Sequence, residues 1–337
     1  MYLRNAWYVA ASADEVGRTP LAHSILDEPV VLWRTEGGKA VALHDLCIHR
    51  RAPLSLGRLV GDAIQCGYHG FTYDGAGRCI KVPAQDRIPA RTAVKAYPLV
   101  ERWGWLWIWM GEAPADEALI PDYRWLDTPG WVPVTGKLHL KANYQLAVDN
   151  LLDLSHETFL HARTIGNAAV AEAPIATREG AAGTVHVERV MRDVPPPPLF
   201  VKTTGRSDNI DRYQFIEWLP PSYVRIEVRG LPVGSNDPNS GIRWWVLNAL
   251  TPETAASCNY YWAVSRNFAI DDAALSDTLQ KATVMTFNED VEMLEAQQAA
   301  IDRDAGRTRQ VDVHIDGGTV LARRNLAALV RAEATAR

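Results

Sequence analysis

Two short motifs, each joining a cysteine to a histidine, most strongly constrain how this chain can fold. They are Cys47-x-His49 and Cys66-x-x-His69, with sixteen residues between them, and each lies close to turn-forming proline or glycine. Each motif offers one thiolate and one imidazole in a loop. The fold must therefore bring two separate loops together if the two pairs are to share one metal site.

This ligand set indicates an iron–sulfur cluster rather than zinc. Thiolates suit ferric iron and sulfide, and two neutral imidazoles on the second iron raise the reduction potential, which is the Rieske arrangement. We expect a [2Fe–2S] cluster with Cys47 and Cys66 on one iron and His49 and His69 on the other. The alternative is a zinc finger with two cysteines and two histidines, but it normally pairs its cysteines closely and places its histidines on a helix.

Other thiol and hydroxyl groups have smaller expected roles. Tyr68 and Ser55 are near the four ligands in the sequence and could donate hydrogen bonds to cluster sulfur. Cys79 and Cys258 have no ligand partner at a matching spacing, so we expect both to be buried, inert thiols.

The chain divides by pattern into two parts and predicts an α+β fold. Residues 1–120 hold short strand-like runs separated by turns such as EGGK and DGAGR, which predict an antiparallel β domain. Residues 121–337 combine longer strand-like runs with helical segments. The longest is an uninterrupted helix from about Ala273 to Asp302, with Asp271 or Asp272 as its cap.

A second group of metal-binding side chains lies in the segment VDNLLDLSHETFLH. His156 and His161 lie there near Asp149 and Asp153, and two histidines with one carboxylate bind ferrous iron and leave positions open for oxygen. The spacing of five residues turns the second histidine by about 140° around a regular helix. We therefore expect the helix to be distorted or to end before His161. Asp153 shares a helical face with His156 and can accept a hydrogen bond from its imidazole.

The carboxylate that completes this site is left open by the pattern alone. The long helix offers four acidic residues in NEDVEMLEAQQ, and periodicity does not choose among Glu289, Asp290, Glu292 and Glu295.

At this point the chain resembles the Rieske non-heme iron aromatic-ring oxygenases, in the branch of the vanillate O-demethylase oxygenase component and dicamba monooxygenase. The likeness runs nearly end to end, through RNAWYVA, CIHRRAPLSLG, CGYHG, DNLLDLSHETFLHA, TPET, SRNFAID, EDVEMLEAQQ and HIDGGTV. The resemblance implies an N-terminal Rieske domain and a C-terminal helix-grip domain.

The resemblance also assigns roles to the second site. It implies His156, His161 and Asp290 as ligands of Fe²⁺, with Asn150 close to the metal. It implies Asp153 as the bridge between an iron ligand and a cluster histidine of the neighbouring subunit in a head-to-tail homotrimer. A separate NAD(P)H-dependent reductase carrying flavin and an iron–sulfur centre would supply electrons.

The activity that the resemblance implies is a monooxygenase reaction with O₂. The expected reaction is O-demethylation of a vanillate-like methoxylated aromatic acid with release of formaldehyde. Alternatives are a Rieske oxygenase acting on an aryl methyl, sulfonate or N-methyl substrate, a ring dioxygenase, and a Rieske electron-transfer protein without oxygen chemistry.

The substrate contacts are less constrained. Alternation in WWVLN places Trp244 and Asn248 on one face of a strand, where Trp244 could stack on a ring and Asn248 could bind a phenol or carboxylate. Ordinary core packing is the alternative for both. Arg225 and Arg229 belong to the other phase of their strand and are expected to face solvent, although either could reach a substrate carboxylate.

Composition excludes several classes of protein. The net charge is −5 at pH 7 and no basic stripe is present, so nucleic acid is not an expected partner. The run WGWLWIWM is too short to cross a bilayer as a helix, and the N-terminus lacks the pattern of a secretory signal. We expect a cytoplasmic protein without membrane contact.

Overall fold

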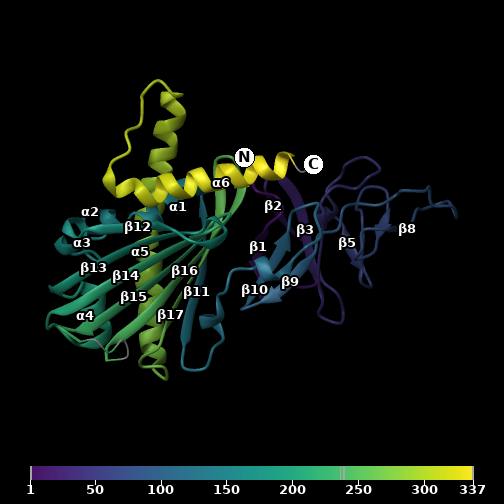
Figure 1. The fold of residues 1–337 in the computed structure, drawn as a ribbon. Helices are drawn as coiled ribbons and strands as arrows, with labels where there is room; N and C mark the ends of the chain where they lie inside the picture. The colour runs from purple at the N-terminus through teal and green to yellow at the C-terminus, as the bar shows by residue number, and fades with distance from the viewer. Residues whose placement is uncertain (1, 236, 238–239, 336–337) are drawn as a thin grey trace. The chain divides into compact units, whose positions relative to one another are not determined.

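The computed structural model describes residues 2–235, 237 and 240–335. The chain forms two compact units (Figure 1). One unit is Tyr2–Ile120 together with Thr251–Thr254, and the other is Pro121–Leu250 together with the residues from Ala255 onward. The expected α+β fold, with antiparallel sheets in both units and a long helix near the C-terminus, is confirmed.

Three small antiparallel sheets build the first unit. In sheet order they are β1 (Trp7–Ser12), β10 (Trp105–Trp109) and β9 (Leu99–Arg102); β2 (Leu21–Ile25), β3 (Glu28–Arg34) and β4 (Ala40–His44); and β5 (Arg58–Val60), β6 (Ala63–Gln65), β7 (Thr72–Tyr73) and β8 (Cys79–Lys81). Short 3₁₀ turns η1 (Leu54–Leu56) and η2 (Glu117–Leu119) lie in the connections.

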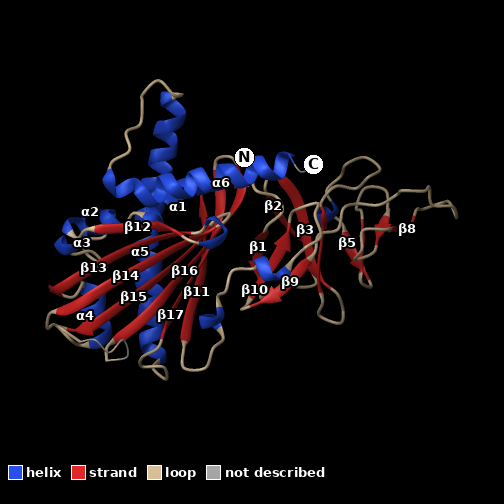
Figure 2. Ribbon diagram, in the orientation of Figure 1, coloured by secondary structure: helices blue, strands red, loops and turns tan. Residues whose placement is uncertain are grey.

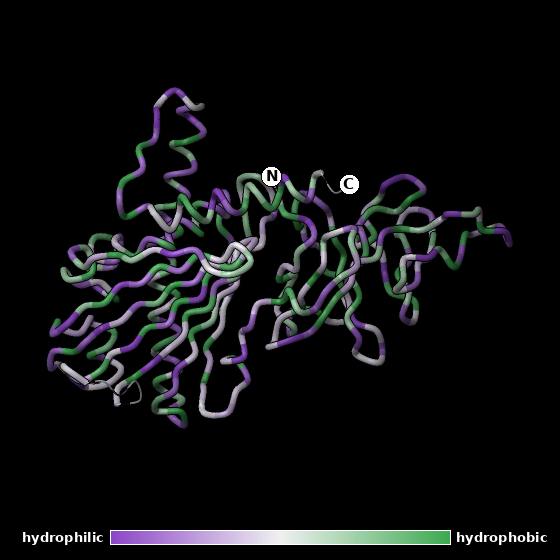
Figure 3. Tube along the Cα trace, viewed as in Figure 1, coloured by the Kyte–Doolittle hydropathy of each residue, from purple (hydrophilic) through white to green (hydrophobic). Residues whose placement is uncertain are grey.

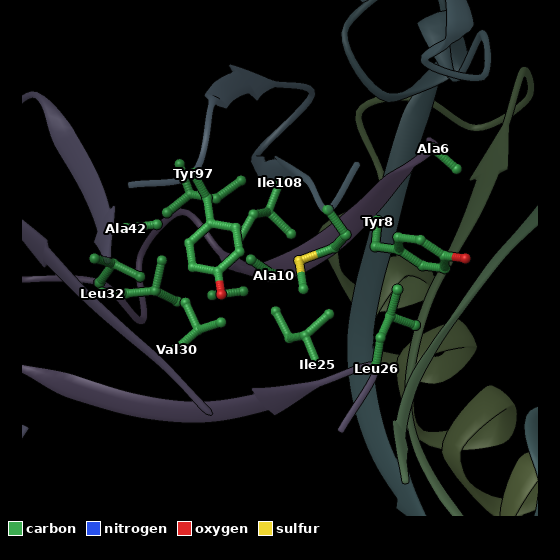
Figure 4. Packing of buried hydrophobic residues seen from close by; sticks show 14 residues of the cluster. Ala6, Tyr8, Ala10, Ile25, Leu26, Val30, Leu32, Ala42, Tyr97 and Ile108 are labelled. Atoms are coloured by element: carbon green, nitrogen blue, oxygen red, sulfur yellow. The ribbon is translucent and has the colours of Figure 1, made fainter. Parts of the chain in front are cut away.

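Strand β3 explains how these sheets share their cores. Successive side chains of a strand point to opposite faces. Val30 and Leu32 therefore enter the core that Figure 4 shows, together with Tyr8 and Ile108, and each of these four is at most 1% exposed. The intervening Val31 and Trp33 enter a second core, which also contains Cys47, Ile64, Cys66 and Tyr73. A strand that is apolar throughout is thus buried on both faces, and its second face supports the loops that carry the cysteines.

The second unit is built on a seven-stranded antiparallel sheet. Its strands, in sheet order, are β11 (Val132–Leu140), β17 (Ser257–Arg266), β16 (Ile242–Thr254), β15 (Tyr223–Pro232), β14 (Ile210–Leu219), β13 (Val185–Val194) and β12 (Ile175–Glu179). Hydrophilic and hydrophobic residues alternate along several of these strands (Figure 3), and buried and half-buried residues alternate along most of β13 and β14, as expected for strands whose two faces differ in exposure.

Helices pack against this sheet (Figure 2). They are α1 (Tyr144–Leu152), α2 (Glu157–Leu160), α3 (Ala168–Glu172), α4 (Pro198–Thr204), α5 (Ala273–Asp304) and α6 (Gly317–Thr335), with 3₁₀ turns η3 (Arg124–Leu126), η4 (Leu154–His156), η5 (Ala181–Gly183) and η6 (His314–Asp316). Helix α1 contacts β14 and β15, and α5 contacts β11. None of the described helices is both long enough and apolar enough to cross a membrane.

The two C-terminal helices differ in how well the sequence predicts them. Helix α5 begins where expected, and Asp272 rather than Asp271 is the cap, because its side chain accepts a hydrogen bond from the N–H of Leu275 (2.9 Å). Helix α6 was not expected. A Cβ at Gly318 would lie 2.5 Å from Val187, so glycine at this position lets α6 approach β13 closely.

Candidate metal centres

Two loops of the first unit carry the cysteine–histidine motifs, and their backbones fold in the same way. The N–H of Cys47 and the N–H of Cys66 each donate to the carbonyl five residues further on, at 2.9 and 2.8 Å. Four residues after each cysteine, Arg51 and Gly70 donate back to the cysteine carbonyl, at 2.8 and 3.0 Å, and both have a positive φ (58° and 73°). The same turn is thus used twice, and each copy presents one thiol and one imidazole.

The four expected cluster ligands come together in this structure. The thiols of Cys47 and Cys66 are buried, each 2% exposed, and interact with each other. The imidazoles of His49 and His69 lie at the surface with their ring centroids 4.6 Å apart, and His49 also stacks on Phe71. Two buried thiols with two converging imidazoles fit a Rieske cluster, in which sulfur and nitrogen ligands hold different irons.

The hydroxyl that contacts a cluster cysteine is one that sequence reasoning missed. The Tyr73 hydroxyl lies 3.2 Å from the Cys47 sulfur, and both side chains are buried. Tyr68 is instead 67% exposed and lies over His69, and Ser55 hydrogen-bonds to the carboxylate of Asp45. Burial raises the pKa of Tyr73 far above its usual value, so the phenol stays protonated and can donate to sulfur.

The helix that carries the two histidines is interrupted between them, as their spacing requires. Helix α1 ends at Leu152, and Asp153 has an extended backbone (φ −117°, ψ 94°) before η4 and the single turn of α2. His156 ends η4 and His161 follows α2. This break brings the two imidazole centroids to 5.1 Å despite the spacing of five residues.

Asp290 on α5 joins these histidines. The candidate ligand atoms of His156, His161 and Asp290 all lie within 4.8 Å of one another. The Asp290 Oδ1 atom is 3.5 Å from Nε2 of His156 and 3.1 Å from Nε2 of His161. Of the other three acidic candidates on α5, Glu289 contacts His161 from the side, Glu295 accepts a hydrogen bond from the N–H of Lys141, and Glu292 is exposed.

The remaining nitrogens of the imidazoles determine which atoms face the metal position. Nδ1 of His156 lies 2.6 Å from the carbonyl oxygen of Asp153, and Nδ1 of His161 lies 2.7 Å from the Glu289 carboxylate. Both partners only accept, so each Nδ1 carries the proton and each Nε2 lone pair is free for a metal. Without a metal, burial lowers the pKa of His161 but hydrogen bonds with Asp290 and Glu289 outweigh it, so the pKa lies above its usual value and metal binding displaces a proton from Nε2.

Asp153 and Asn150 both lie beside this group. The Asp153 backbone carbonyl, rather than its carboxylate, is the partner of His156; the carboxylate accepts from the N–H of Ser155 (2.9 Å) and lies 4.0 Å from Arg189. The amide of Asn150 donates to Asp290 Oδ1 at 3.0 Å.

A cavity of about 100 Å³ extends from these three residues into the unit. It is comparable in size to cavities that hold a single aromatic ring. Its walls come from the end of α1 and the segment after it, from β14 to β17, from α5 and from the region around α4. Besides the three ligand candidates, the lining residues are Asn150, Leu151, Leu154, Glu157, Ile165, Pro197, Leu199, Arg212, Ile226, Val228, Trp244, Val246, Val264, Leu279, Thr283, Thr286 and Phe287.

Only one of the two expected substrate residues reaches this cavity. Trp244 lines it, whereas Asn248 does not: its amide donates to a β15 carbonyl (2.9 Å) and accepts from the Tyr260 hydroxyl (2.7 Å). Arg225 and Arg229 pair with acidic neighbours and do not line the cavity either. The charged pair on the cavity wall, Arg212 and Glu157, was not anticipated.

Known protein families match both units. The Rieske [2Fe–2S] domain matches residues 6–98, and the vanillate O-demethylase oxygenase C-terminal domain matches residues 140–332. The chain belongs to the Rieske non-heme iron oxygenases of the vanillate O-demethylase branch. Its cofactors are therefore a [2Fe–2S] cluster and a mononuclear iron. The first match spans both cysteine–histidine motifs, and the second spans the histidine–aspartate group.

Curated Rieske oxygenases resemble the chain over almost its whole length. A putative toluene-4-sulfonate monooxygenase system iron–sulfur subunit from Comamonas testosteroni is 37% identical, covering 99% of this chain and 98% of the relative. A vanillate O-demethylase oxygenase subunit from a Pseudomonas species is 36% identical, covering 99% and 96%. The crystal structure of dicamba monooxygenase bound to 3,6-dichlorosalicylic acid is 34% identical with a TM-score of 0.94, covering 99% of both chains.

Proposed function

We propose that the chain is the oxygenase component of a monooxygenase system that O-demethylates a vanillate-like methoxylated aromatic acid, using O₂ and releasing formaldehyde. Electrons come from a separate NAD(P)H-dependent reductase with flavin and iron–sulfur centres. The observation that carries this proposal is the convergence of His156, His161 and Asp290 at a mainly apolar cavity of single-ring size, in a chain that also has a Rieske domain.

Each residue near the iron has a distinct task in this proposal. When bound there, ferrous iron supplies the activation of O₂. His156, His161 and Asp290 hold the metal, and Asn150 fixes the orientation of the Asp290 carboxylate through its hydrogen bond. The apolar walls exclude water and keep the substrate's methyl group near the metal. Cys47, His49, Cys66 and His69 hold the cluster, and Trp244 packs against the ring.

The assembly that we propose is a head-to-tail homotrimer of cytoplasmic chains, each with a cluster domain at residues 1–120 and a catalytic domain at residues 121–337. Asp153 links an iron ligand to a cluster histidine of the neighbouring subunit. Two observations support this role: Asp153 contacts His156 through its backbone carbonyl, and its half-buried carboxylate is still accessible to a partner.

A second candidate reaction is hydroxylation of the methyl group of an aryl sulfonate. The toluene-4-sulfonate relatives, at 37% and 36% identity, are as similar to the chain as the vanillate relatives are. Both reactions attack a C–H bond of a methyl group at one end of an anionic ring. A pure electron carrier is disfavoured because it would have no use for the histidine–aspartate group.

Product analysis tests the proposed function. The protein, reconstituted without air and supplied with a surrogate reductase, is offered methoxybenzoates and 4-methylbenzenesulfonate under labelled O₂. We expect formaldehyde and a phenol from a methoxybenzoate, and about three irons per chain. A labelled benzyl alcohol from the sulfonate alone would favour the second reaction, and two irons per chain without any product would contradict both.

A further inference from the structure

The cavity contains one cation among the residues that the structure describes as lining it. Apart from the three metal ligands, the ionisable lining residues are Arg212 on β14 and Glu157 on α2. The remaining walls are aliphatic or aromatic, with a few neutral polar groups. A charged substituent on a substrate would therefore find Arg212 as its opposite charge.

Arg212 is buried but does not use all of its donors. Its side chain is on the inward face of β14, and the residue is 4% exposed. One terminal nitrogen donates to the Glu157 carboxylate at 2.9 Å, and the other makes a long contact of 3.4 Å with the carbonyl of Ile165. The Nε–H has no partner among the described residues. A buried donor left unpaired is costly and calls for an explanation, and a ligand in the cavity supplies one.

Glu157 orients this guanidinium and also competes with a ligand for it. Its carboxylate is 3% exposed and accepts from Arg212 and from Gln214, at 2.9 and 2.8 Å. Arg189, itself 2% exposed, interacts electrostatically with both Glu157 and Arg212. Asp153, whose carboxylate is 4.0 Å from Arg189, is the main anionic partner of that cation, so Glu157 acts mainly on Arg212. The attraction of Arg212 for a second anion therefore rests on the Nε–H that Glu157 leaves unpaired.

This inference rests on the proposed function. We propose that Arg212 is the specificity residue that binds the anionic substituent of the aromatic substrate, through its free Nε–H. The shared chemistry is a carboxylate or sulfonate on a single ring, and its charge-assisted hydrogen bond to guanidinium is among the stronger polar contacts in proteins. The ring then packs against Trp244 and Ile226, and its methyl-bearing end is left near the iron ligands.

Binding measurements on the anaerobic holoprotein test this assignment without needing turnover. The probes are 4-methoxybenzoate, its neutral methyl ester and 4-methylbenzenesulfonate, each measured by calorimetry. In the wild type we expect the acid or the sulfonate to bind at least about ten times more tightly than the ester. The comparison of the two anions shows which one the site accepts.

Two variants shift anion affinity in opposite directions. In the paired variant Arg212→Met with Glu157→Gln, both buried charges are removed together, so neither is left unpaired. We expect it to lose about 10- to 100-fold in affinity for the anion and little for the ester. Glu157→Gln alone keeps an acceptor for Arg212 but removes the competing charge, so anion affinity should rise. Glu172→Gln, in the next helix α3 and outside the cavity lining, is the control and should change neither affinity.

Several outcomes would overturn the assignment. These are equal losses for anion and ester in the paired variant, weaker anion binding by Glu157→Gln, or wild-type binding that does not favour an anion. If the paired variant does not fold, the direction of change in Glu157→Gln decides. The proposed function fails separately: wild-type protein that prefers anions but releases no formaldehyde would contradict demethylation and leave Arg212 as an anion site.

Discussion

At the scale of single residues, the proposed iron site should depend on groups that do not touch the metal. The Nδ1 atom of His161 donates to Glu289, and this contact holds the ring so that Nε2 faces Asp290. Removing such a partner typically costs 10- to 100-fold in metal affinity. We therefore expect Glu289→Ala to weaken Co²⁺ and Fe²⁺ binding by about 10- to 100-fold, measured by anaerobic titration.

Two further variants separate positioning from a general effect of charge on the same helix. Glu289→Gln keeps an oxygen that accepts from His161 and should recover much of the lost affinity. Glu292→Ala removes an exposed carboxylate of α5 and should change nothing. Equal losses in Glu289→Ala and Glu292→Ala would show that only charge matters.

The Tyr73 hydroxyl should tune the cluster in the first unit. A donor to a ligand sulfur stabilises the reduced, more negative cluster, so Tyr73→Phe should lower the reduction potential. A hydrogen bond worth about 1.4 kcal/mol more in the reduced state corresponds to about 60 mV for one electron. Protein-film voltammetry measures this shift, and Tyr68→Phe, which changes an exposed ring, should leave the potential unchanged.

The residues of the site were only partly accessible to sequence reasoning. Spacing correctly required a helix break before His161, but α5 offers acidic side chains around its circumference, so only the family resemblance pointed to Asp290. Arg212 had a readable signal. Side chains at alternate positions of a strand point to the same face, and Arg212 therefore faces inward with the buried Ile216 and Trp218. A charged residue at such a position indicates a buried partner or ligand. No sequence signal pointed to Tyr73, because its proximity to Cys47 depends on how separate parts of the chain come together in the fold.

At the scale of elements, the buried carboxylate of Asp211 on β14 accepts hydrogen bonds from β13 and from the turn after β15. Asp211 on β14 is 2% exposed and accepts from Arg192 Nη1 (2.8 Å), from the N–H of Asp193 in the irregular end of β13 (3.0 Å), and from the N–H of Gly234 after β15 (3.1 Å). Asp211→Asn loses the charge and part of these bonds. We expect it to lower the free energy of unfolding by about 1–3 kcal/mol in urea titrations, with exposed Asp208→Asn as the neutral control.

The same carboxylate gives this part of the fold a dependence on pH. Burial raises the pKa of Asp211, but the hydrogen bonds from Asp193, Arg192 and Gly234 outweigh it, so the pKa lies below its usual value. The stabilisation is therefore complete above the unfolded pKa of about 3.9 and is lost as the pH falls through the lower folded pKa. Between pH 5 and 3 the wild type should lose more stability than Asp211→Asn. Parallel pH profiles would contradict this.

Elements were more predictable than their arrangement. The segment after Asp272 contains no proline or glycine, and it predicted α5 nearly to its last residue. Alternation of apolar and polar residues predicted most strands of the large sheet. Alternation could not show that β3 is buried on both faces, because its run of apolar residues fits any buried strand. Helix α6 was missed because it packs through few buried positions, among them Gly318 and Ala322, which carry little hydrophobic signal.

At the scale of the whole molecule, the proposed head-to-tail trimer predicts complementation between two inactive chains. Cys66→Ser should remove the cluster and leave the iron site, whereas His161→Ala should remove the iron and leave the cluster. Each variant alone should be inactive. If the cluster of one subunit serves the iron of the next, co-expressed chains should form mixed trimers in which a cluster and an iron meet across an interface.

The size of the recovered activity distinguishes the two electron routes. A working interface is one at which an intact cluster of one subunit meets an intact iron site of the next. Random mixing of equal amounts gives most cyclic trimers one such interface, whereas the wild type has three, so the mixture should show about a quarter of wild-type turnover per chain. If electrons stayed within a subunit, no mixed trimer could work, because no chain has both centres. Adding Asp153→Asn to the Cys66→Ser chain, which supplies the iron, should abolish the recovery while both metal contents stay unchanged. Full recovery with that variant would exclude Asp153 as the bridge, and no recovery at all would exclude the trimer route.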